Sequence, residues 1–217
     1  MNTLVFNLLF VRFMNKCYLL INKLLHLFEV MRVPEREKNV YLTFDDGPEE
    51  EITDYVLDVL SKYNFKATFF CKGCNIDKYS NILLRINKEG HAVGNHTYSH
   101  LNGFDTTTKD YLSDVEKADA ILQSKLFRPP FGVLRLSQFL FLKYNKYHIV
   151  HWSLDSGDSL LDAFDLTSCL KRIKNKTRKG DVVLFHCCKR HEKETKALLP
   201  LYLEWLADNG YNAKILK

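Results

Sequence analysis

From residue 34 onward the chain alternates short apolar runs with longer segments whose apolar residues recur at helical spacing. About seven such pairs, each of roughly 25 residues, follow one another, which is typical of a parallel β-sheet with its helices outside. The sequence therefore predicts an α/β fold. We expect strands at 40–44, 66–71, 91–94, 126–128, 148–154, 181–186 and 211–216, and helices at 51–63, 79–88, 108–123, 136–144, 166–174 and 192–208.

Polar signatures follow five of these predicted strands. In a β/α barrel the C-terminal ends of all strands lie on one rim, where active sites form. A doubly wound open sheet instead gathers such residues mainly at one switch point. Signatures after five different strands therefore favour a (β/α) barrel, with seven units by the count above. They are TFDDGP at 43–48, NHTYSH at 95–100, RPPFG at 128–132, WSLDSGD at 152–158 and VLFH at 183–186.

Length and charge fit one ordinary globular domain. The chain has 217 residues, 46% of them hydrophobic and 26% charged, and a net charge of +5. Its basic clusters at 171–179 and 189–196 lie on or beside predicted helices, which favours solvated helix faces over a nucleic-acid surface. We expect no nucleic-acid partner.

The first 33 residues form a separate N-terminal segment. It lacks the charge-free run of about 18 to 20 residues that spans a bilayer, and it lacks the charged start and cleavage site of a secretory signal. From Phe13 onward apolar residues recur at helical spacing, which predicts an amphipathic helix. Such a helix lies on a membrane surface or covers the bottom of the following domain. Both alternatives stay open, as do the compartment and the oligomeric state.

The six cysteines are expected to be reduced. Cys71 and Cys74 have the C-x-x-C spacing of redox and zinc sites, but no second pair stands at zinc-ribbon spacing. Cys71 ends an apolar run, where a buried thiol is the ordinary outcome. A thiol-based redox protein stays an alternative.

Two neighbouring carboxylates, Asp45 and Asp46, end the first predicted strand. Consecutive strand residues point to opposite faces, so both serve one site only if the strand ends there. Gly47 and Pro48 provide that end, and Pro48 suits the first turn of a helix.

His96 and His100 stand four residues apart, so in a helical turn both imidazoles face one point. With Asp46 they make three nitrogen and oxygen ligands, a common set in hydrolytic zinc sites with one open position. Cobalt, iron or nickel also suits such a shell.

The remaining signatures offer an oxyanion donor and an acid. Two prolines stiffen the segment before Phe131 and leave its N–H as an isolated donor suited to an oxyanion. Arg128 is permanently charged and can hold a carboxylate ionised. His186 ends the most apolar strand, and with a carboxylate partner it can stay protonated and act as a general acid.

In this order the five signatures resemble those of the NodB-type polysaccharide deacetylases, a carbohydrate esterase family that removes N-acetyl groups from chitin-like and peptidoglycan sugars. The resemblance covers about residues 38–217 and implies a distorted seven-unit β/α barrel with a catalytic domain at 34–217. It implies an N-acetylated carbohydrate substrate and a zinc ion. The implied roles are Asp45 as base, Asp46, His96 and His100 as metal ligands, Arg128 orienting Asp45, His186 as acid tuned by Asp155 or Asp158, and Phe131, Pro130 and Trp152 around the oxyanion and substrate.

Three positions depart from that pattern. Ser159 stands where the family usually has tryptophan, which opens one wall of the groove, and Cys187 stands where an aspartate is common. Cys187 should point away from the site, because it neighbours His186 in a strand. Phe131 replaces a frequent tyrosine, which is harmless if only its amide acts. A non-catalytic carbohydrate-binding relative and a deacylase of small amides remain alternatives.

Overall fold

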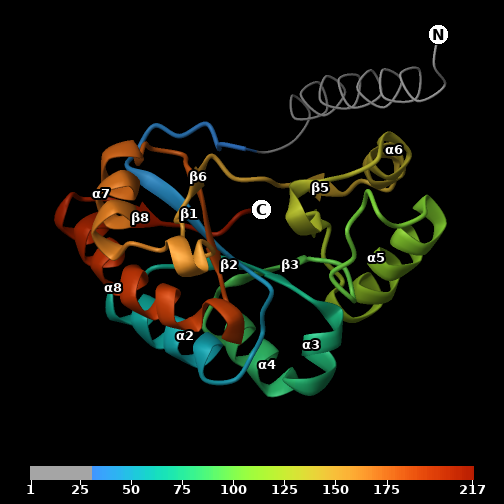
Figure 1. Cartoon of the computed structure of the whole chain (residues 1–217), viewed down its shortest axis with the longest axis horizontal. Helices are drawn as coiled ribbons and strands as arrows, with labels where there is room; N and C mark the ends of the chain where they lie inside the picture. The colour runs from blue at the N-terminus through green and yellow to red at the C-terminus, as the bar shows by residue number, and fades with distance from the viewer. Residues whose placement is uncertain (1–30) are drawn as a thin grey trace, which may run out of the picture.

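The computed structural model describes residues 31–217, and the predicted amphipathic helix of the N-terminal segment lies outside this range except for its last residues (Figure 1). The described chain forms one sheet in which neighbouring strands run parallel, in the order β5-β4-β3-β2-β1-β7-β6, with β8 beside the start of β1. The strands are β1 (Asn39–Asp45), β2 (Ala67–Cys71), β3 (Ala92–Asn95), β4 (Leu126–Phe127), β5 (His148–Ile149), β6 (Leu154–Asp155), β7 (Val182–His186) and β8 (Asn212–Ala213).

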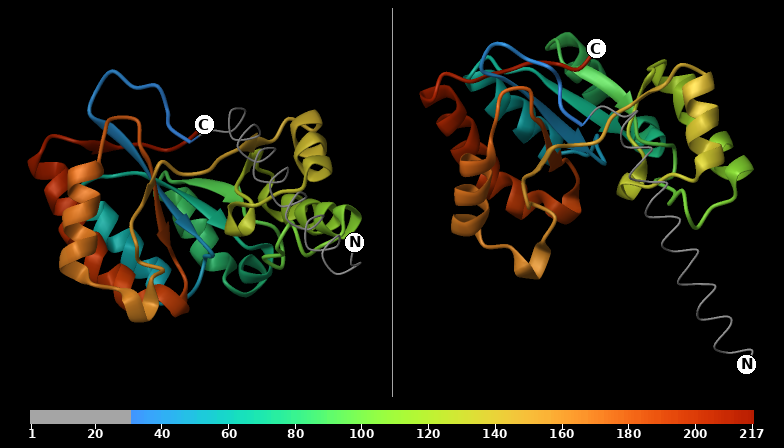
Figure 2. Two further views of the ribbon diagram at one scale, coloured as in Figure 1. Left: turned by 45° about the horizontal axis from the view of Figure 1, so that its top comes forward. Right: turned by 90° about the horizontal axis from the view of Figure 1, so that it is seen from above.

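Helices cover the outer face of this sheet in two groups, at opposite ends of the molecule in Figure 2. One core packs β1, β2 and β7 against α2 (Ile52–Lys62), α4 (Ser80–Lys88), α7 (Leu166–Lys176) and α8 (Glu192–Asp208). A second core packs β4 and β5 against α5 (Thr108–Leu122) and α6 (Leu136–Tyr144). The short helix α3 (Gly73–Lys78), which the sequence did not predict, follows β2.

Alternation along β1 decides which side chains reach the interior of the barrel. Leu42 and Phe44 point outward, and Phe44 stacks on Phe69 of β2 with ring centroids 5.2 Å apart. The alternating residues Thr43 and Asp45 therefore point inward, as successive strand residues must. Phe185 of β7 also packs on Phe44, at 5.7 Å. The outward core thus fixes the register that turns Asp45 toward the interior.

The predicted barrel class is confirmed, and the sheet is open between β5 and β6. The run at 148–154, predicted as one strand, is two short strands, β5 beside β4 and β6 beside β7, separated by residues 150–153. Within that stretch the carbonyl oxygens of Val150 and His151 accept hydrogen bonds from Arg128, at 3.2 and 2.8 Å. A side chain replaces a neighbouring strand there, because buried carbonyl groups need a partner.

The prediction that Pro48 begins a helix is wrong. The Gly47–Pro48 peptide is cis, and α2 begins only at Ile52, after Glu51 with a φ of 63°. The stretch between them lies beside the rim of the barrel, where it carries Glu49 into the cavity described below. In residues 31–217 no helix has the length and apolar character that a membrane span requires.

Candidate active site

A cavity of about 590 Å³ opens at the C-terminal ends of the strands and is lined by residues of all five signatures. The first signature supplies the two aspartates and the second both histidines, so the rim brings together residues that lie 50 or more positions apart in the sequence. Signature residues in its lining are Asp45, Asp46, His96, His100, Pro129, Phe131, Trp152, Asp155, Leu184 and His186. Both prolines of this signature are buried, and Pro129 lines the cavity, whereas Pro130, which the resemblance placed near the substrate, does not.

The buried side chain of Arg128 fixes the position of the Asp45 carboxylate. Its guanidinium is fully buried and donates to Asp45 Oδ1 at 2.7 Å and to Thr43 Oγ1 at 2.8 Å. It lies 4.2 Å from the ring centroid of Phe70, which shields the pair from water. Asp45 Oδ2 forms no hydrogen bond within residues 31–217 and lies 3.9 Å from His96 Nε2. One oxygen of this carboxylate is therefore held, and the other is free to act.

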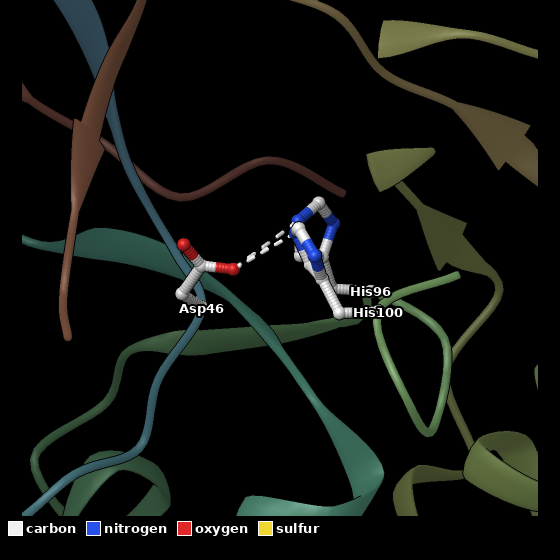
Figure 3. A group of neighbouring side chains, drawn as sticks. All are labelled: Asp46, His96 and His100. Carbon is white, nitrogen blue, oxygen red and sulfur yellow. Dashed lines mark ion pairs between the residues drawn. The ribbon is translucent and has the colours of Figure 1, made fainter. Parts of the chain in front are cut away.

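Asp46, His96 and His100 converge on one point, with their ligand atoms all within 4.8 Å of one another (Figure 3). Asp46 Oδ1 lies 3.0 Å from His100 Nε2 and 3.8 Å from His96 Nε2. It is buried, yet it makes no well-oriented hydrogen bond in the described part of the chain. Burial opposes ionisation, but the contact with His100 holds the pKa of Asp46 well below its usual value. An ionised oxygen without a proper donor, facing two imidazole nitrogens, fits a divalent metal ion.

His96 is oriented for ligation by the backbone of another signature. Its Nδ1 donates to the carbonyl oxygen of Arg128 at 2.8 Å, which leaves the lone pair of Nε2 facing Asp46. Burial lowers the pKa of His96, so the ring is neutral, the form that binds a metal.

The segment from His96 to His100 is a loop, and the predicted helical turn is wrong. Thr97 and His100 have positive φ angles of 62° and 59°, and Asn95 Oδ1 accepts the N–H of Thr97 at 2.8 Å. These left-handed residues turn both imidazoles toward Asp46 (Figure 3). The His100 ring also meets the edge of Phe131, at 4.8 Å between centroids.

Phe131 is held in an unusual backbone conformation after the two prolines. Its φ is 59°, and its side chain is 62% exposed on the rim. The N–H of Phe131 donates to no other residue between 31 and 217, whereas the next N–H, of Gly132, donates to Pro129. A left-handed non-glycine residue costs energy and is often found at functional sites.

His186 is paired with Asp158, which settles the partner that the sequence left open. Its Nδ1 donates to Asp158 Oδ1 at 2.9 Å, and Asp158 Oδ2 accepts from the His186 N–H at 2.7 Å and from Thr195 Oγ1 at 2.9 Å. Burial disfavours the charged ring, but the hydrogen bond and charge of Asp158 raise the pKa of His186 to about 9. Asp155 instead accepts the N–H of Gly157 at 2.7 Å and lines the cavity.

Sequence reasoning missed six residues of the cavity wall, which are Glu49, Lys72, Cys188, Lys189, Arg190 and His191. Cys188 points its Sγ at Asp46 Oδ2, 3.7 Å away, and the His191 ring lies 4.9 Å from that of His186. Both come shortly after the last signature, and His191 lies in the basic cluster at 189–196 that was interpreted as a solvated helix face. Their closeness in sequence to His186 could have indicated that they lie in the cavity, but the basic residues around them favoured a solvated surface.

Within residues 31–217 the C-x-x-C pair forms no disulfide. Cys71 and Cys74 are free thiols, and burial raises the pKa of Cys71 far above its ordinary value. A reactive thiol needs the opposite shift. Cys187 points away from His186 into the outer core, with its Sγ 3.4 Å from Thr53 Oγ1, as predicted.

The fold and this rim define a β/α barrel with a candidate metal centre flanked by Asp45 and His186, each held by a buried partner. The sequence pattern of the polysaccharide deacetylase family matches residues 32–147, more than half of the chain, and the chain belongs to that family. A peptidoglycan-N-acetylglucosamine deacetylase of Bacillus cereus is 33% identical over 184 residues, which cover 82% of this chain and 86% of the relative.

Two further comparisons agree. A second Bacillus cereus peptidoglycan-N-acetylglucosamine deacetylase is 41% identical over 131 residues, covering 58% of this chain and 48% of the relative, so the match spans about half of that protein. The crystal structure of the Bc1960 peptidoglycan N-acetylglucosamine deacetylase, bound to an N-hydroxybenzamide, superimposes with a TM-score of 0.81. It is 32% identical and covers 87% of this chain and 90% of that one.

Proposed function

We propose that this protein is a metal-dependent hydrolase that removes N-acetyl groups from an amino sugar of a peptidoglycan-type or chitin-like polysaccharide and releases acetate. The two Bacillus cereus relatives are named for that activity on peptidoglycan N-acetylglucosamine. The observation that carries the proposal is the convergence of Asp46, His96 and His100 beside a carboxylate held by Arg128.

Asp46, His96 and His100 are the residues that hold the metal. Their donor set of one carboxylate and two neutral imidazoles suits zinc, and cobalt and nickel accept the same ligands. When bound, such an ion supplies Lewis acidity toward the acetyl carbonyl and lowers the pKa of a water molecule.

Asp45 is the general base of the proposed reaction. Arg128 holds Oδ1, so the free Oδ2 takes the proton of the attacking water as its oxygen bonds to the acetyl carbon. The carbonyl oxygen gains negative charge in this step. The unpartnered N–H of Phe131 donates to it, which stabilises the tetrahedral oxyanion.

His186 completes the reaction as general acid. Asp158 fixes its Nδ1, so the proton available to the cavity is the one on Nε2. With a pKa of about 9 the ring is protonated at neutral pH. The carbon–nitrogen bond breaks as Nε2 gives its proton to the sugar nitrogen, so acetate and a free amine leave.

The surroundings of the cavity suit a sugar of a longer chain. Trp152 and the exposed Phe131 provide apolar surfaces on the wall of the cavity. Ser159 also lines the cavity, and its side chain is small. Sugar rings pack their apolar faces on such aromatic surfaces, while their hydroxyl groups need polar partners. A small N-acyl amide would leave much of this wall uncovered.

Acetate release from a panel of N-acetylglucosamine oligomers and peptidoglycan fragments tests the proposal. Turnover must require added metal, stop with chelator and fall about 10²–10⁴-fold in the Asp45→Asn variant. A non-catalytic carbohydrate-binding relative gives binding without acetate at every metal tested. A deacylase of small amides gives turnover of N-acetylated monosaccharides or simple amides at least as fast as of oligomers.

A further inference from the structure

The outer face of α6 carries an exposed apolar stripe, formed by Leu136, Leu140 and Tyr144. These residues stand four apart, so they follow one another along one side of the helix. They are 45%, 57% and 86% exposed, whereas Leu84 on α4 and Leu201 on α8 are the single exposed large apolar side chains of their helices. Isolated exposed leucines are ordinary, but a continuous apolar stripe marks an interaction surface.

The opposite face of α6 already packs on the protein. Phe139 and Leu142 belong to the core beneath the helix, and Gln138 donates to the carbonyl oxygen of Gly103 at 2.8 Å. The helix is therefore apolar on two sides, and it lies at the periphery of the described chain (Figure 1). Helices that are apolar all round are normally buried on every side, so the composition of α6 predicts a partner for the stripe.

The segment that carries the stripe has only positive charges. Residues 120–154 contain no aspartate or glutamate, and Lys143 and Lys146 stand at the C-terminal end of the stripe. Both lysines are exposed, and neither forms an ion pair with a carboxylate of residues 31–217. Leucines flanked by unpaired lysines, with a tyrosine at the end, are typical of a helix that lies on an anionic lipid surface.

Charge also decides between the candidate occupants of the stripe. The N-terminal segment 1–30 carries three basic residues and one acidic residue, so it is itself positive. A second copy that met this stripe with its own would bring lysines against lysines. Both arrangements place like charges together, which is unfavourable. A soluble polyanion matches the charge but offers the leucines no apolar phase, whereas a bilayer that contains anionic lipids offers both.

We propose that α6 docks this protein on an anionic membrane surface, with the stripe inserted among the lipid headgroups and Lys143 and Lys146 on the lipid phosphates. A helix of nine residues is far too short to span a bilayer, so the protein lies on the surface. The helix connects the end of β4 at the rim to the start of β5 at the opposite end of the barrel. Docking through the side of α6 therefore leaves the rim of the cavity uncovered.

Vesicle flotation of the full chain tests the apolar part of this surface. Wild-type protein should bind vesicles of phosphatidylglycerol and phosphatidylcholine more tightly than vesicles of phosphatidylcholine alone, and salt should reduce the difference. The triple variant Leu136→Ser, Leu140→Ser and Tyr144→Ser should bind the anionic vesicles about tenfold more weakly. Leu84→Ser, which removes an exposed leucine from α4, is the matched control and should bind like wild type.

A lysine pair tests the charged part independently. Lys143→Gln with Lys146→Gln should weaken binding to the anionic vesicles about fivefold for each lysine removed. Lys171→Gln with Lys176→Gln removes the same charge from α7 and should have little effect. A control pair that weakens binding as much as the α6 pair would mean that net charge, and not α6, attracts the lipid.

Two further results would overturn the α6 surface. A triple variant that binds vesicles like wild type would assign lipid binding to the N-terminal segment. A wild-type protein that binds no vesicle, and forms a dimer that the triple variant dissociates in light scattering, would show that a second copy covers the stripe. Circular dichroism melting checks that the variants fold, as expected for exposed positions.

Vesicle binding and turnover are read separately. Because the stripe lies outside the cavity, acetate release from soluble oligomers should be the same in the triple variant and in wild type. If no substrate releases acetate, the proposed function fails while the vesicle experiment still decides on α6. If acetate is released but the triple variant binds vesicles like wild type, only the membrane surface fails.

Discussion

Asp158 accepts two hydrogen bonds from His186: its Oδ1 accepts one from the ring Nδ1 at 2.9 Å, and its Oδ2 accepts one from the backbone N–H at 2.7 Å. The carboxylate is fully buried and also accepts from Thr195 on α8. One side chain thereby sets the position, the tautomer and the charge of the proposed acid. The end of β7 and the helix α8 both hydrogen-bond to the Asp158 carboxylate. The local fold and the proposed proton transfer therefore depend on one residue.

Replacing Asp158 by Asn should move the high-pH limb of kcat to lower pH. In the wild-type protein the acid is protonated below about pH 9, so activity should fall as pH rises through that value. In the variant the carboxylate charge that raises the pKa of His186 is gone, whereas burial still lowers that pKa. The pKa of His186 should therefore fall toward or below its ordinary 6.5. A pH–rate profile of both proteins measures the shift, and an unmoved limb would remove His186 from the role of acid.

The same pair links stability to pH. Because the folded pKa of His186 is raised, its contribution to the free energy of unfolding is complete below pH 6.5 and is lost as pH rises through about 9. Denaturant unfolding across that window should show a decline that is reduced in Asp158→Asn. Parallel declines in both proteins would contradict the linkage.

Mutations of the proposed base and of a proposed metal ligand should have different effects on metal content. Asp45→Asn should lower kcat about 10²–10⁴-fold and keep the metal, because this residue offers no ligand atom to the triad. His96→Ala should lose both activity and metal. Atomic absorption of the dialysed proteins measures occupancy. Equal metal content in the two variants would contradict the assigned roles.

Metal removal should destabilise the wild-type protein. A ligand that binds only the folded state at 100 times its Kd adds about 2.7 kcal/mol. Melting with excess zinc should therefore occur at higher temperature than melting with chelator. Asp46→Asn, which weakens the oxygen ligand without emptying the site, should show little of this difference. A full zinc shift in that variant would place the ion elsewhere.

The sequence predicted the outer core and the rim residues because both follow from local patterns. The apolar run before His186 and the alternation in β1 define strands by themselves, and strand ends in a parallel sheet share one rim. Side-chain identity and order then indicated the family, even where local geometry was predicted wrongly. His96 and His100 do face Asp46, although the loop between them is not helical.

What the sequence did not predict depends on long-range contacts. At the gap between β5 and β6, Arg128, more than 20 residues upstream, donates hydrogen bonds to the carbonyl oxygens of Val150 and His151. The choice between Asp155 and Asp158 depends on a loop whose course is set by β7 and α8. Neither a hydrogen bond from a distant side chain nor the path of a loop changes the hydrophobic periodicity of the sequence, so periodicity could not predict them.

Arg128 should be the most sensitive position of the buried interior. Arg128→Leu leaves the Asp45 carboxylate and two carbonyl groups without their donor, and breaking a buried ion pair costs about 3–5 kcal/mol. Urea unfolding measures this loss. The double variant Arg128→Leu with Asp45→Leu should recover part of it, since no charge is then stranded. A double variant as unstable as the sum of two separate losses would mean that the ion pair is not the cause.

Cys188 should affect the metal affinity of the site through its contact with Asp46. Its thiol, the one hydrogen-bond donor to Asp46 Oδ2 in the described chain, is a weak donor at 3.7 Å. Outer-shell partners are worth about 10–100-fold in metal affinity, so Cys188→Ala should weaken zinc binding by about tenfold or less. Cys188→Ser, which keeps a donor, should bind like wild type or tighter.

A matched control separates this effect from a general loss of packing. Cys169→Ala removes a buried thiol from the outer core, away from the cavity. Competition with a chromogenic chelator gives the zinc affinity of each protein. If Cys169→Ala weakens zinc binding as much as Cys188→Ala does, the contact with Asp46 has no role in ligation. Because burial and the negative charge of Asp46 raise the pKa of Cys188 to about 12, alkylation at neutral pH should leave this comparison undisturbed.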